Sequence, residues 1–214
     1  MADIGLRATP GLMPCHRILP DFLPTDDAAR FLAYAVTHRD SFKPTKTRAA
    51  ADAAVREQIR TSVGTRRLGA FGDILSTALH QHLPELFTGA GIKPFVPDGL
   101  DLQCVAHNDG GFYKRHIDTQ TVESVDHLRV LTAVYYMHRT PKAYTGGTLR
   151  LYAIGGPRNE AFTDIEPAHN TLVVFPAFTP HEVLPVQCRS NDVADARYSV
   201  NCWFYRTRAR AQTA

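Results

Sequence analysis

The chain has 214 residues, of which 44% are hydrophobic and 21% are charged, and its formal net charge is +3 at pH 7. These values lie in the range of one ordinary globular domain with a sizeable core. The basic residues are scattered, except for a short group near the C-terminus that has the character of a solvated tail. The charge therefore gives no support for nucleic-acid binding.

Residue usage argues against two further classes of protein. No apolar run approaches the roughly 20 residues that a membrane-spanning helix needs, so no membrane association is expected. The four cysteines show no C-x-x-C spacing, and so sparse a set argues against a disulfide framework. We therefore expect a protein of the reducing cytoplasm.

Helix signals come first along the chain. Thr25-Asp26-Asp27 offers capping side chains and negative charge ahead of apolar residues on one helical face, which predicts a helix to about His38. The stretch Ser41–Ala54 has little periodicity and is expected to be an exposed or irregular connection. A second helix is predicted over about Leu68–Phe87, where apolar residues recur every three or four positions. It is expected to brace a sheet.

From about Asp101 the sequence is typical of many short strands. Short runs rich in Val, Thr, Tyr and Phe are separated by Gly, Pro, Asn and Asp. Strands are predicted near Asp101–His107, Phe112–Asp118, Arg129–Met137, Thr148–Tyr152, Thr171–Phe175, His181–Val186 and Arg197–Tyr205. Helices followed by strands indicate an α+β, mainly β fold with a helical layer on a sandwich or barrel. We expect a single domain over 1–214, with 1–100 as N-terminal helical support and 101–206 as the β core.

The pattern His116-Ile117-Asp118 is a candidate metal site. A strand sends positions i and i+2 to the same face, so one imidazole and one carboxylate emerge side by side. His181, at the start of a later apolar strand, is placed to supply a third ligand. Two histidines and one carboxylate leave open positions for O2 and a co-substrate, as in non-haem iron(II) oxygenases. With ten histidines in the chain, H-x-D alone also fits ordinary surface or core histidines.

The last predicted strand separates polar from apolar side chains. Its alternation puts Arg197, Ser199, Asn201 and Trp203 on one face and Tyr198, Val200, Cys202 and Phe204 on the other. An inward-facing arginine needs an anionic partner, and arginine suits bidentate binding of a carboxylate. A dicarboxylate co-substrate would supply that partner. An internal ion pair with Asp or Glu and an exposed edge strand are the alternatives.

The C-terminal half resembles the prolyl 4-hydroxylase-like branch of the 2-oxoglutarate and Fe(II)-dependent dioxygenase superfamily. The resemblance covers about Asp101–Tyr205 and rests on the order and spacing of several segments. These are GGFYKRHID at Gly110–Asp118, RVLTAVYYMH at Arg129–His138, GGTLRLY at Gly146–Tyr152, FTDIEP at Phe162–Pro167, TLVVFPAFTPHEVLPV at Thr171–Val186 and RYSVNCWF at Arg197–Phe204. The resemblance implies a double-stranded β-helix, or jelly-roll, catalytic core with supporting N-terminal helices.

The resemblance also implies a role for five residues of the site. His116, Asp118 and His181 match the iron ligands, and Arg197 matches the residue that grips the distal carboxylate of 2-oxoglutarate. Tyr136 matches a tyrosine that hydrogen-bonds the same carboxylate. The implied cofactor is Fe(II), with 2-oxoglutarate and O2 as co-substrates.

Three further residues match positions on the substrate side of the pocket in the peptidyl-proline members of the family. They are Arg129, Trp203 and, in the same neighbourhood, Tyr113. A surface ion pair is the alternative for Arg129, and a core aromatic is the alternative for Trp203. The polar and acidic segment Thr119–His127 occupies the place of a mobile lid in such enzymes, although any loop between strands has similar composition.

Three features depart from the family pattern. A tyrosine that similar prolyl hydroxylases carry upstream of the Gly-rich turn is replaced by Ala106 or His107. The polar loop Gln187–Ala196 lengthens the connection from His181 to Arg197. No match can be assigned in the first hundred residues. The co-substrate contacts and the substrate mouth are therefore expected to differ in detail.

The implied reaction is hydroxylation of an unactivated C–H bond with release of succinate and CO2. A prolyl residue in a protein or peptide is the first choice of substrate, and a free amino acid or small metabolite is the alternative. Two other classes remain open, a zinc-dependent hydrolase and a non-catalytic jelly-roll binding protein. The chain contains no H-E-x-x-H motif, which argues against the hydrolase.

Overall fold

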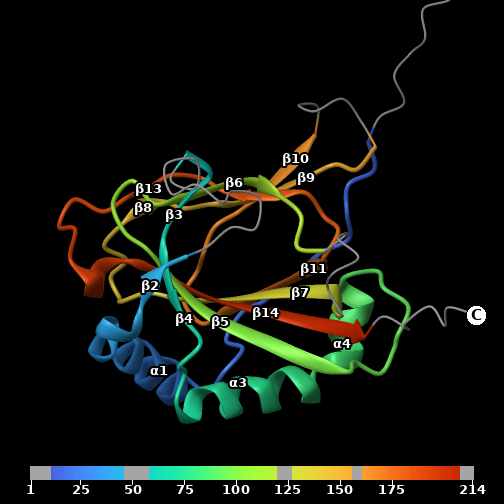
Figure 1. Cartoon of the computed structure of the whole chain (residues 1–214), viewed down its shortest axis with the longest axis horizontal. Helices are drawn as coiled ribbons and strands as arrows, with labels where there is room; N and C mark the ends of the chain where they lie inside the picture. Colours follow the sequence, from blue (N-terminus) through green and yellow to red (C-terminus); the bar gives the residue numbers. More distant parts are fainter. Residues whose placement is uncertain (1–10, 46–57, 120–126, 156–160, 208–214) are drawn as a thin grey trace, which may run out of the picture.

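The computed structural model describes residues 11–45, 58–119, 127–155 and 161–207, and Figure 1 shows the chain as a cartoon. The elements in chain order are β1 (Arg17–Leu19), α1 (Thr25–Thr37), the 3-10 helix η1 (Arg39–Ser41), β2 (Lys43–Pro44), β3 (Arg60–Thr61), β4 (Val63–Thr65), α3 (Ala70–Gln81), α4 (Leu83–Gly89), β5 (Gly99–His107), β6 (Phe112–His116), β7 (His127–Met137), β8 (Thr145–Gly146), β9 (Leu149–Tyr152), β10 (Phe162–Ile165), β11 (Thr171–Pro176), β12 (His181–Val183), β13 (Val186–Gln187), the 3-10 helix η2 (Val193–Asp195) and β14 (Arg197–Thr207).

Two antiparallel sheets form the body of the fold. The larger sheet has seven strands in the order β1-β11-β7-β14-β5-β4-β2, and the smaller has five in the order β10-β9-β12-β6-β3. β13 and β8 form a separate two-stranded ribbon. The helices α1, α3 and α4 lie on one side of the larger sheet, and the smaller sheet lies on its other side (Figure 1). The expected mainly β jelly roll with a helical layer is confirmed.

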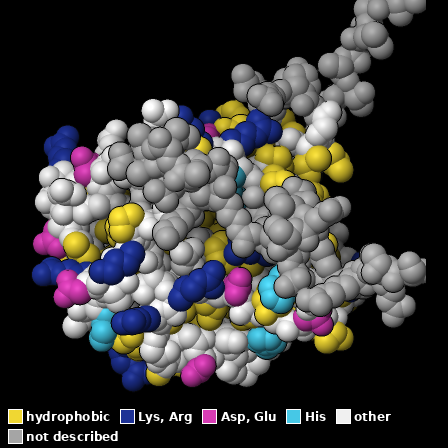
Figure 2. All heavy atoms as spheres, in the orientation of Figure 1, with side chains coloured by type: hydrophobic (Ala, Val, Ile, Leu, Met, Phe, Trp, Pro, Cys, Tyr) yellow, Lys and Arg dark blue, Asp and Glu magenta, His cyan; other side chains and the backbone are white. Residues whose placement is uncertain are grey.

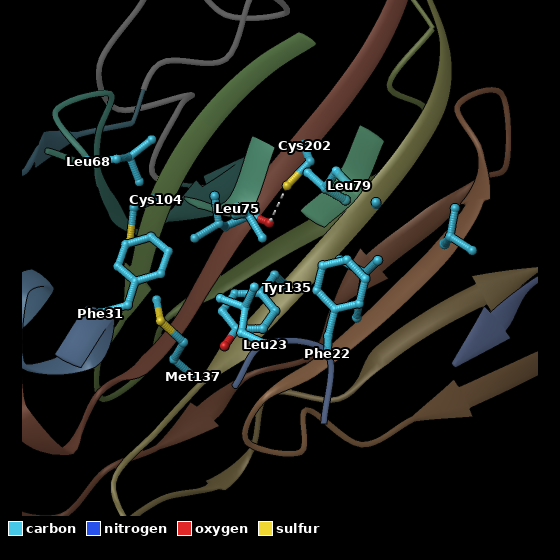
Figure 3. Packing of buried hydrophobic residues seen from close by; sticks show 14 of the residues in the cluster. Phe22, Leu23, Phe31, Leu68, Leu75, Leu79, Cys104, Tyr135, Met137 and Cys202 are labelled. Carbon is cyan, nitrogen blue, oxygen red and sulfur yellow. Dashed lines mark hydrogen bonds between the residues drawn. The ribbon is translucent and has the colours of Figure 1, made fainter. Parts of the chain in front are cut away.

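A large apolar core joins the helices to the outer face of the larger sheet. The strand β14 contributes alternate residues to this core, namely Tyr198, Val200, Cys202 and Phe204. This is the apolar face that the sequence predicted. From the helices come residues such as Phe31, Leu75 and Leu79, which pack around Tyr135 and Met137 of β7 (Figure 3). The helical layer therefore fixes the larger sheet from behind and leaves its other face free for chemistry.

The inner face of the larger sheet meets the smaller sheet across a second apolar cluster. Its members come from β7, β9, β10 and β11 and are Val134, Tyr136, Leu149, Leu151, Ile165, Val173 and Phe175. The cluster closes one half of the space between the sheets. The other half is lined by polar side chains of β14 and β5, which carry one part of the candidate site, and by residues at the ends of β6 and β12, which carry the other part.

Two predicted elements differ in their bounds, and a third differs in how its first turn is capped. The single helix predicted over Leu68–Phe87 is two helices, α3 and α4, because Pro84 in the first turn of α4 lacks an amide hydrogen and cannot continue a preceding helix. The strand predicted over His181–Val186 ends at Val183, and Val186 starts β13. No side chain caps α1 by a hydrogen bond within the described residues, although Asp26 and Asp27 do occupy its first turn.

The first hundred residues contribute more than helices. β1 pairs with β11 at one edge of the larger sheet, β4 and β2 extend the other edge, and β3 pairs with β6 in the smaller sheet. None of these short strands was predicted. Part of Ser41–Ala54 forms β2, and the remainder from residue 46 lies outside the described residues.

Positively and negatively charged side chains are mixed on the face of the molecule that Figure 2 shows. On the face seen in Figure 2, Lys and Arg side chains are interspersed with Asp and Glu and do not form one continuous basic patch. Among the described residues, no helix is long and apolar enough to cross a membrane.

Asn170 ties the segment before α1 to the larger sheet. Its side-chain oxygen accepts hydrogen bonds from the Leu23 amide at 3.0 Å and the Tyr135 hydroxyl at 2.8 Å. Its side-chain nitrogen donates to the Leu23 carbonyl at 2.8 Å. The residue has φ of 54°, a left-handed conformation that asparagine tolerates better than most residues. One buried amide therefore joins the N-terminal segment to β7 and β11.

We predict that Asn170→Ala lowers the free energy of unfolding by about 4 kcal/mol. Three buried hydrogen bonds at about 1 kcal/mol each are lost, and alanine in the left-handed region costs about 1 kcal/mol more. Asn191→Ala is the matched control, because Asn191 also has a positive φ (50°) but is exposed. It should lose only about 1 kcal/mol. Urea denaturation of both variants measures the difference, and equal losses would contradict the role of the buried amide.

Candidate functional site

His116, Asp118 and His181 meet between the two sheets. His116 ends β6, His181 begins β12, and the two residues lie directly opposite each other in the smaller sheet. The Asp118 carboxylate is 3.8 Å from His116 Nε2 and 3.6 Å from His181 Nε2. One ligand atom from each residue lies within 4.8 Å of the other two, and no other group of three potential metal ligands occurs in the described part of the chain.

Asp118 reaches this position by a route that the sequence did not predict. β6 ends at His116, so Asp118 lies beyond the strand, and the expected i, i+2 alternation does not place it. Its backbone amide instead donates to the Ala177 carbonyl at 2.9 Å, which turns the chain at the end of β6. The Thr132 hydroxyl on β7 then donates to the carboxylate at 2.9 Å. Asp118 therefore connects the smaller sheet to the larger one.

Both histidines are oriented with Nε2 toward the carboxylate. His116 Nδ1 is 2.8 Å from the Lys114 carbonyl and His181 Nδ1 is 2.9 Å from the Thr179 carbonyl. A carbonyl only accepts, so each Nδ1 carries a hydrogen, and in a neutral ring of this tautomer Nε2 has the free lone pair. This is the arrangement that metal-binding histidines adopt, with the second ring nitrogen held by a hydrogen bond.

Electrostatics at the site favour the forms that bind metal. Burial lowers the pKa of His116 to about 3, and the neighbouring His181 adds to this effect. Burial alone would raise the pKa of Asp118, but His181 and His116 outweigh it, so the pKa lies below its ordinary value. The cluster therefore holds a carboxylate anion beside a neutral His116 imidazole. Two imidazoles and one carboxylate are a donor set that suits Fe(II), so the residues present fit the expected ion.

The three residues expected on the substrate side surround this cluster. Tyr113 stacks on the His116 ring with centroids 3.5 Å apart. The Arg129 guanidinium lies 3.7 Å above the Trp203 ring, and both residues contribute to lowering the pKa of Asp118. Arg129 also pairs with Asp101 at 3.6 Å, so the ion pair considered from the sequence is present as well.

Arg197 lies at the other end of the polar face. Its side chain is 1% exposed, and its Nε donates to the Gly147 carbonyl at 2.7 Å. The Tyr136 ring centre is 5.0 Å from the guanidinium carbon. Among the described residues, no Asp or Glu forms an ion pair with Arg197. The internal ion pair considered from the sequence is therefore not found there, and the buried guanidinium has an unmatched charge.

Two buried donors near Arg197 also lack partners. The Tyr136 hydroxyl and His107 Nε2 make no hydrogen bond to the residues described. Burial raises the pKa of Tyr136 to about 12, so its hydroxyl keeps the proton and can donate it. Gly147 makes room for the arginine, because a Cβ there would lie 2.5 Å from Arg197 Cδ. The expected pairing of Arg197 with Tyr136 at one anion site agrees with this geometry.

The cluster of His116, Asp118 and His181 and the group around Arg197 both contact the inner face of the larger sheet. Thr132 pairs with Trp203 and Tyr136 pairs with Ser199 across β7 and β14, so the two residues that act on Asp118, Thr132 and Trp203, lie on the same face of the larger sheet as Tyr136. Thr132 and Tyr136 are four positions apart, or about 13 Å along a strand. The two clusters could therefore bind opposite ends of one small molecule, a metal-binding end near Asp118 and an anionic end near Arg197.

The sequence did not identify three residues of the site, namely Thr132, Gly147 and His107. One expected segment lies partly outside the described residues. Thr132 shares the alternation of Tyr136 on β7, and the paired glycines at Gly146-Gly147 were visible only as part of the family resemblance. The sequence places His107 at the end of the predicted strand Asp101–His107, and nothing in the sequence pairs it with Arg197. Residues 120–126 of the expected lid lie outside the described residues.

Known proteins share both sequence and fold with this chain. Residues 102–205 match the profile of the 2OG-Fe(II) oxygenase superfamily. An uncharacterized PKHD-type hydroxylase from Synechocystis is 29% identical over 190 residues, which cover 86% of this chain. The aligned part is 61% of that relative, so this chain spans about three fifths of its length.

Two solved prolyl hydroxylases show the same fold. One, from Trichoplax adhaerens in complex with a hypoxia inducible factor oxygen degradation domain peptide fragment, has a TM-score of 0.69 at 19% identity and covers 90% of this chain and 84% of its own. A Pseudomonas putida prolyl-4-hydroxylase has a TM-score of 0.65 at 24% identity, with 92% and 94% covered. The part of the chain from 102 to 205 is therefore similar in sequence to the 2OG-Fe(II) oxygenase superfamily, and the chain has a prolyl hydroxylase-like fold.

Proposed function

We propose that this protein is a 2-oxoglutarate-dependent dioxygenase that hydroxylates an unactivated C–H bond, releasing succinate and CO2. Members of that superfamily use Fe(II), with 2-oxoglutarate and O2 as co-substrates. The observation that carries the proposal is the buried Arg197, which has no ion-pair partner among the described carboxylates. It lies between the same two sheets as a cluster of two histidines and one carboxylate. Bound Fe(II) would supply activation of O2 by electron transfer, which protein side chains cannot provide.

His116, Asp118 and His181 are the proposed ligands of the iron. Their hydrogen bonds to Lys114 and Thr179 carbonyls and to the Thr132 hydroxyl fix the ligand atoms before the metal arrives. A zinc hydrolase could use the same three residues, but its reaction does not require a buried anion site beside the metal, whereas a dicarboxylate co-substrate does. The unmatched Arg197 therefore favours the oxygenase.

Arg197 and Tyr136 are the proposed holders of the distal carboxylate of 2-oxoglutarate. A carboxylate would neutralise the guanidinium and accept the hydrogen bond that the Tyr136 hydroxyl does not make to any described residue. The apolar cluster beside them, with Val134 and Phe175, limits the access of water to the carbon chain of the co-substrate.

A prolyl residue in a protein or peptide is the proposed substrate, and a cytoplasmic location is part of the same proposal. The related Trichoplax adhaerens structure holds a peptide fragment, which supports a peptide substrate. Tyr113, Arg129 and Trp203 place one cation and two aromatic side chains beside the proposed iron ligands. The four cysteines, all within the described residues, are free thiols, as a reducing compartment requires.

Substrate class is tested by single-turnover assays with the reconstituted enzyme. Proline-containing peptides should accelerate succinate formation above the uncoupled rate and should gain one oxygen atom by mass spectrometry. Free proline and the same peptides with alanine in place of proline are the controls. Acceleration by free amino acids alone would overturn the peptide assignment and leave the oxygenase intact.

We predict that Asp118→Ala abolishes turnover and that Arg197→Met weakens 2-oxoglutarate binding by about 100-fold or more. Asp118→Ala removes a metal ligand, whereas Arg197→Met removes two charge-assisted hydrogen bonds worth about 1.5 kcal/mol each. Anaerobic titration of the apo protein with Fe(II) and 2-oxoglutarate, followed by the charge-transfer absorption of the chelate, measures binding in both variants, and succinate formation in the presence of O2 measures turnover. Circular dichroism checks that each variant folds. Tight binding of zinc without any such absorption in the unsubstituted protein would overturn the oxygenase assignment.

We predict that Thr132→Val weakens Fe(II) binding about tenfold, because the ligand Asp118 loses the hydrogen bond that orients it. Thr179→Val is the matched control. The buried Thr179 hydroxyl makes no hydrogen bond within the described structure, and its backbone carbonyl still holds His181. Anaerobic metal titration against a competing chelator should show unchanged affinity for Thr179→Val. Equal weakening in the two variants would contradict the role of Thr132.

A further inference from the structure

His107 lies deep in the anion site but has no assigned role. It ends β5, directly opposite Arg197 on β14, and its side chain is 2% exposed. The register places both side chains on the face that carries Ser199 and Tyr136. The imidazole therefore belongs to the same polar cluster as the guanidinium.

The contact with Arg197 determines where His107 carries its hydrogen. Arg197 Nη1 is 3.4 Å from His107 Nδ1, and a guanidinium can only donate. Nδ1 is therefore the acceptor, and a neutral ring must carry its hydrogen on Nε2. Burial lowers the pKa of His107 well below its ordinary value, and the positive charges of Arg197 and Arg60 lower it further. The ring is neutral, with an N–H at Nε2.

This Nε2–H has no acceptor among the described residues. Buried polar groups are nearly always hydrogen-bonded, so an orphan donor at such depth indicates a missing partner. Two cations, Arg197 and Arg60, lie close enough to act on the ring, and the Tyr136 hydroxyl is a second orphan donor in the same cluster. A group with several acceptor atoms and negative charge would satisfy both orphan donors and the charge of Arg197.

We propose that His107 Nε2 donates a hydrogen bond to the distal carboxylate of 2-oxoglutarate, so that Arg197, Tyr136 and His107 bind that carboxylate together. The inference rests on the proposed function. A carboxylate offers about four lone-pair sites, enough for a guanidinium and two further donors. His107 is thus a co-substrate-binding residue that increases selectivity for 2-oxo acids with a second carboxylate.

Selectivity between two 2-oxo acids tests this role without any turnover. Anaerobic titrations of the Fe(II)-loaded protein use 2-oxoglutarate and 2-oxopentanoate, which has a methyl group where 2-oxoglutarate has its distal carboxylate. His107→Phe keeps a ring of similar size but removes both nitrogens. We predict that it weakens 2-oxoglutarate binding by about 10- to 100-fold, the usual effect of one hydrogen bond to a charged group. Binding of 2-oxopentanoate should change little.

Two substitutions of His107 by amide residues distinguish the hydrogen bond donated from Nε2 from the contact of Nδ1 with Arg197. In His107→Gln the amide nitrogen occupies roughly the place of Nε2, whereas in His107→Asn the amide lies near the place of Nδ1. Gln can therefore donate to the carboxylate, and Asn can accept from Arg197 without donating to the carboxylate. Gln should retain most of the preference for 2-oxoglutarate, and Asn should lose it as Phe does. Thermal melts of the metal-free forms verify that each variant folds.

The outcomes separate this inference from the proposed function. Equal weakening of both 2-oxo acids in His107→Phe, or equal behaviour of the Gln and Asn variants, would overturn donation from Nε2 and leave His107 a structural residue. Should His107→Phe fail to fold, the Gln and Asn pair decides alone. If the unsubstituted protein binds neither 2-oxo acid, the proposed function itself fails. If it prefers 2-oxoglutarate and every His107 variant keeps that preference, only the role of His107 is lost.

Discussion

The buried charge of Arg197, which pairs with no described carboxylate, is the constraint on which the polar half of the interior depends. A guanidinium withdrawn from water is costly unless its donors and its charge are satisfied. The Gly147 carbonyl satisfies one donor, and a side chain at position 147 would collide with the arginine. Tyr136 and His107 add donors rather than acceptors, so they do not neutralise the charge. The cluster is built to be completed by an anion that the chain itself does not supply within its described part.

The rest of the fold keeps this charge in place. Strand β14 carries Arg197 and Ser199 on its inner face and four residues of the main core on its outer face. Because the side chains alternate, packing against α1 and α3 fixes the inner face as firmly as the outer one. Asn170 extends the same support to the segment before α1. The residues that hold the site in place therefore belong to an apolar core that contains no residue of the site itself.

Local patterns predicted much of this arrangement, and long-range pairing accounts for the parts that they missed. Alternation along β14 correctly separated the polar from the apolar face, and the H-x-D pattern located two members of the metal cluster. Strand register, however, depends on contacts between distant segments, so nothing near His107 indicates that it faces Arg197. For the same reason, strands as short as β1 to β4 have no periodic pattern of their own and form only because a partner strand is already present.

The two ends of the proposed co-substrate site belong to different sheets. His116 and His181 lie on the smaller sheet, whereas Arg197, Tyr136 and His107 lie on the larger one. Within the described residues, Asp118 spans the gap through its hydrogen bond to Thr132. A metal ion alone would gather groups from the smaller sheet and Asp118. A 2-oxo acid with a distal carboxylate would also neutralise the charge on the larger sheet, so one proposed co-substrate would contact groups of both sheets. Because the apolar cluster already packs the sheets together, the distance between the two ends is fixed by the fold and selects a molecule of matching length.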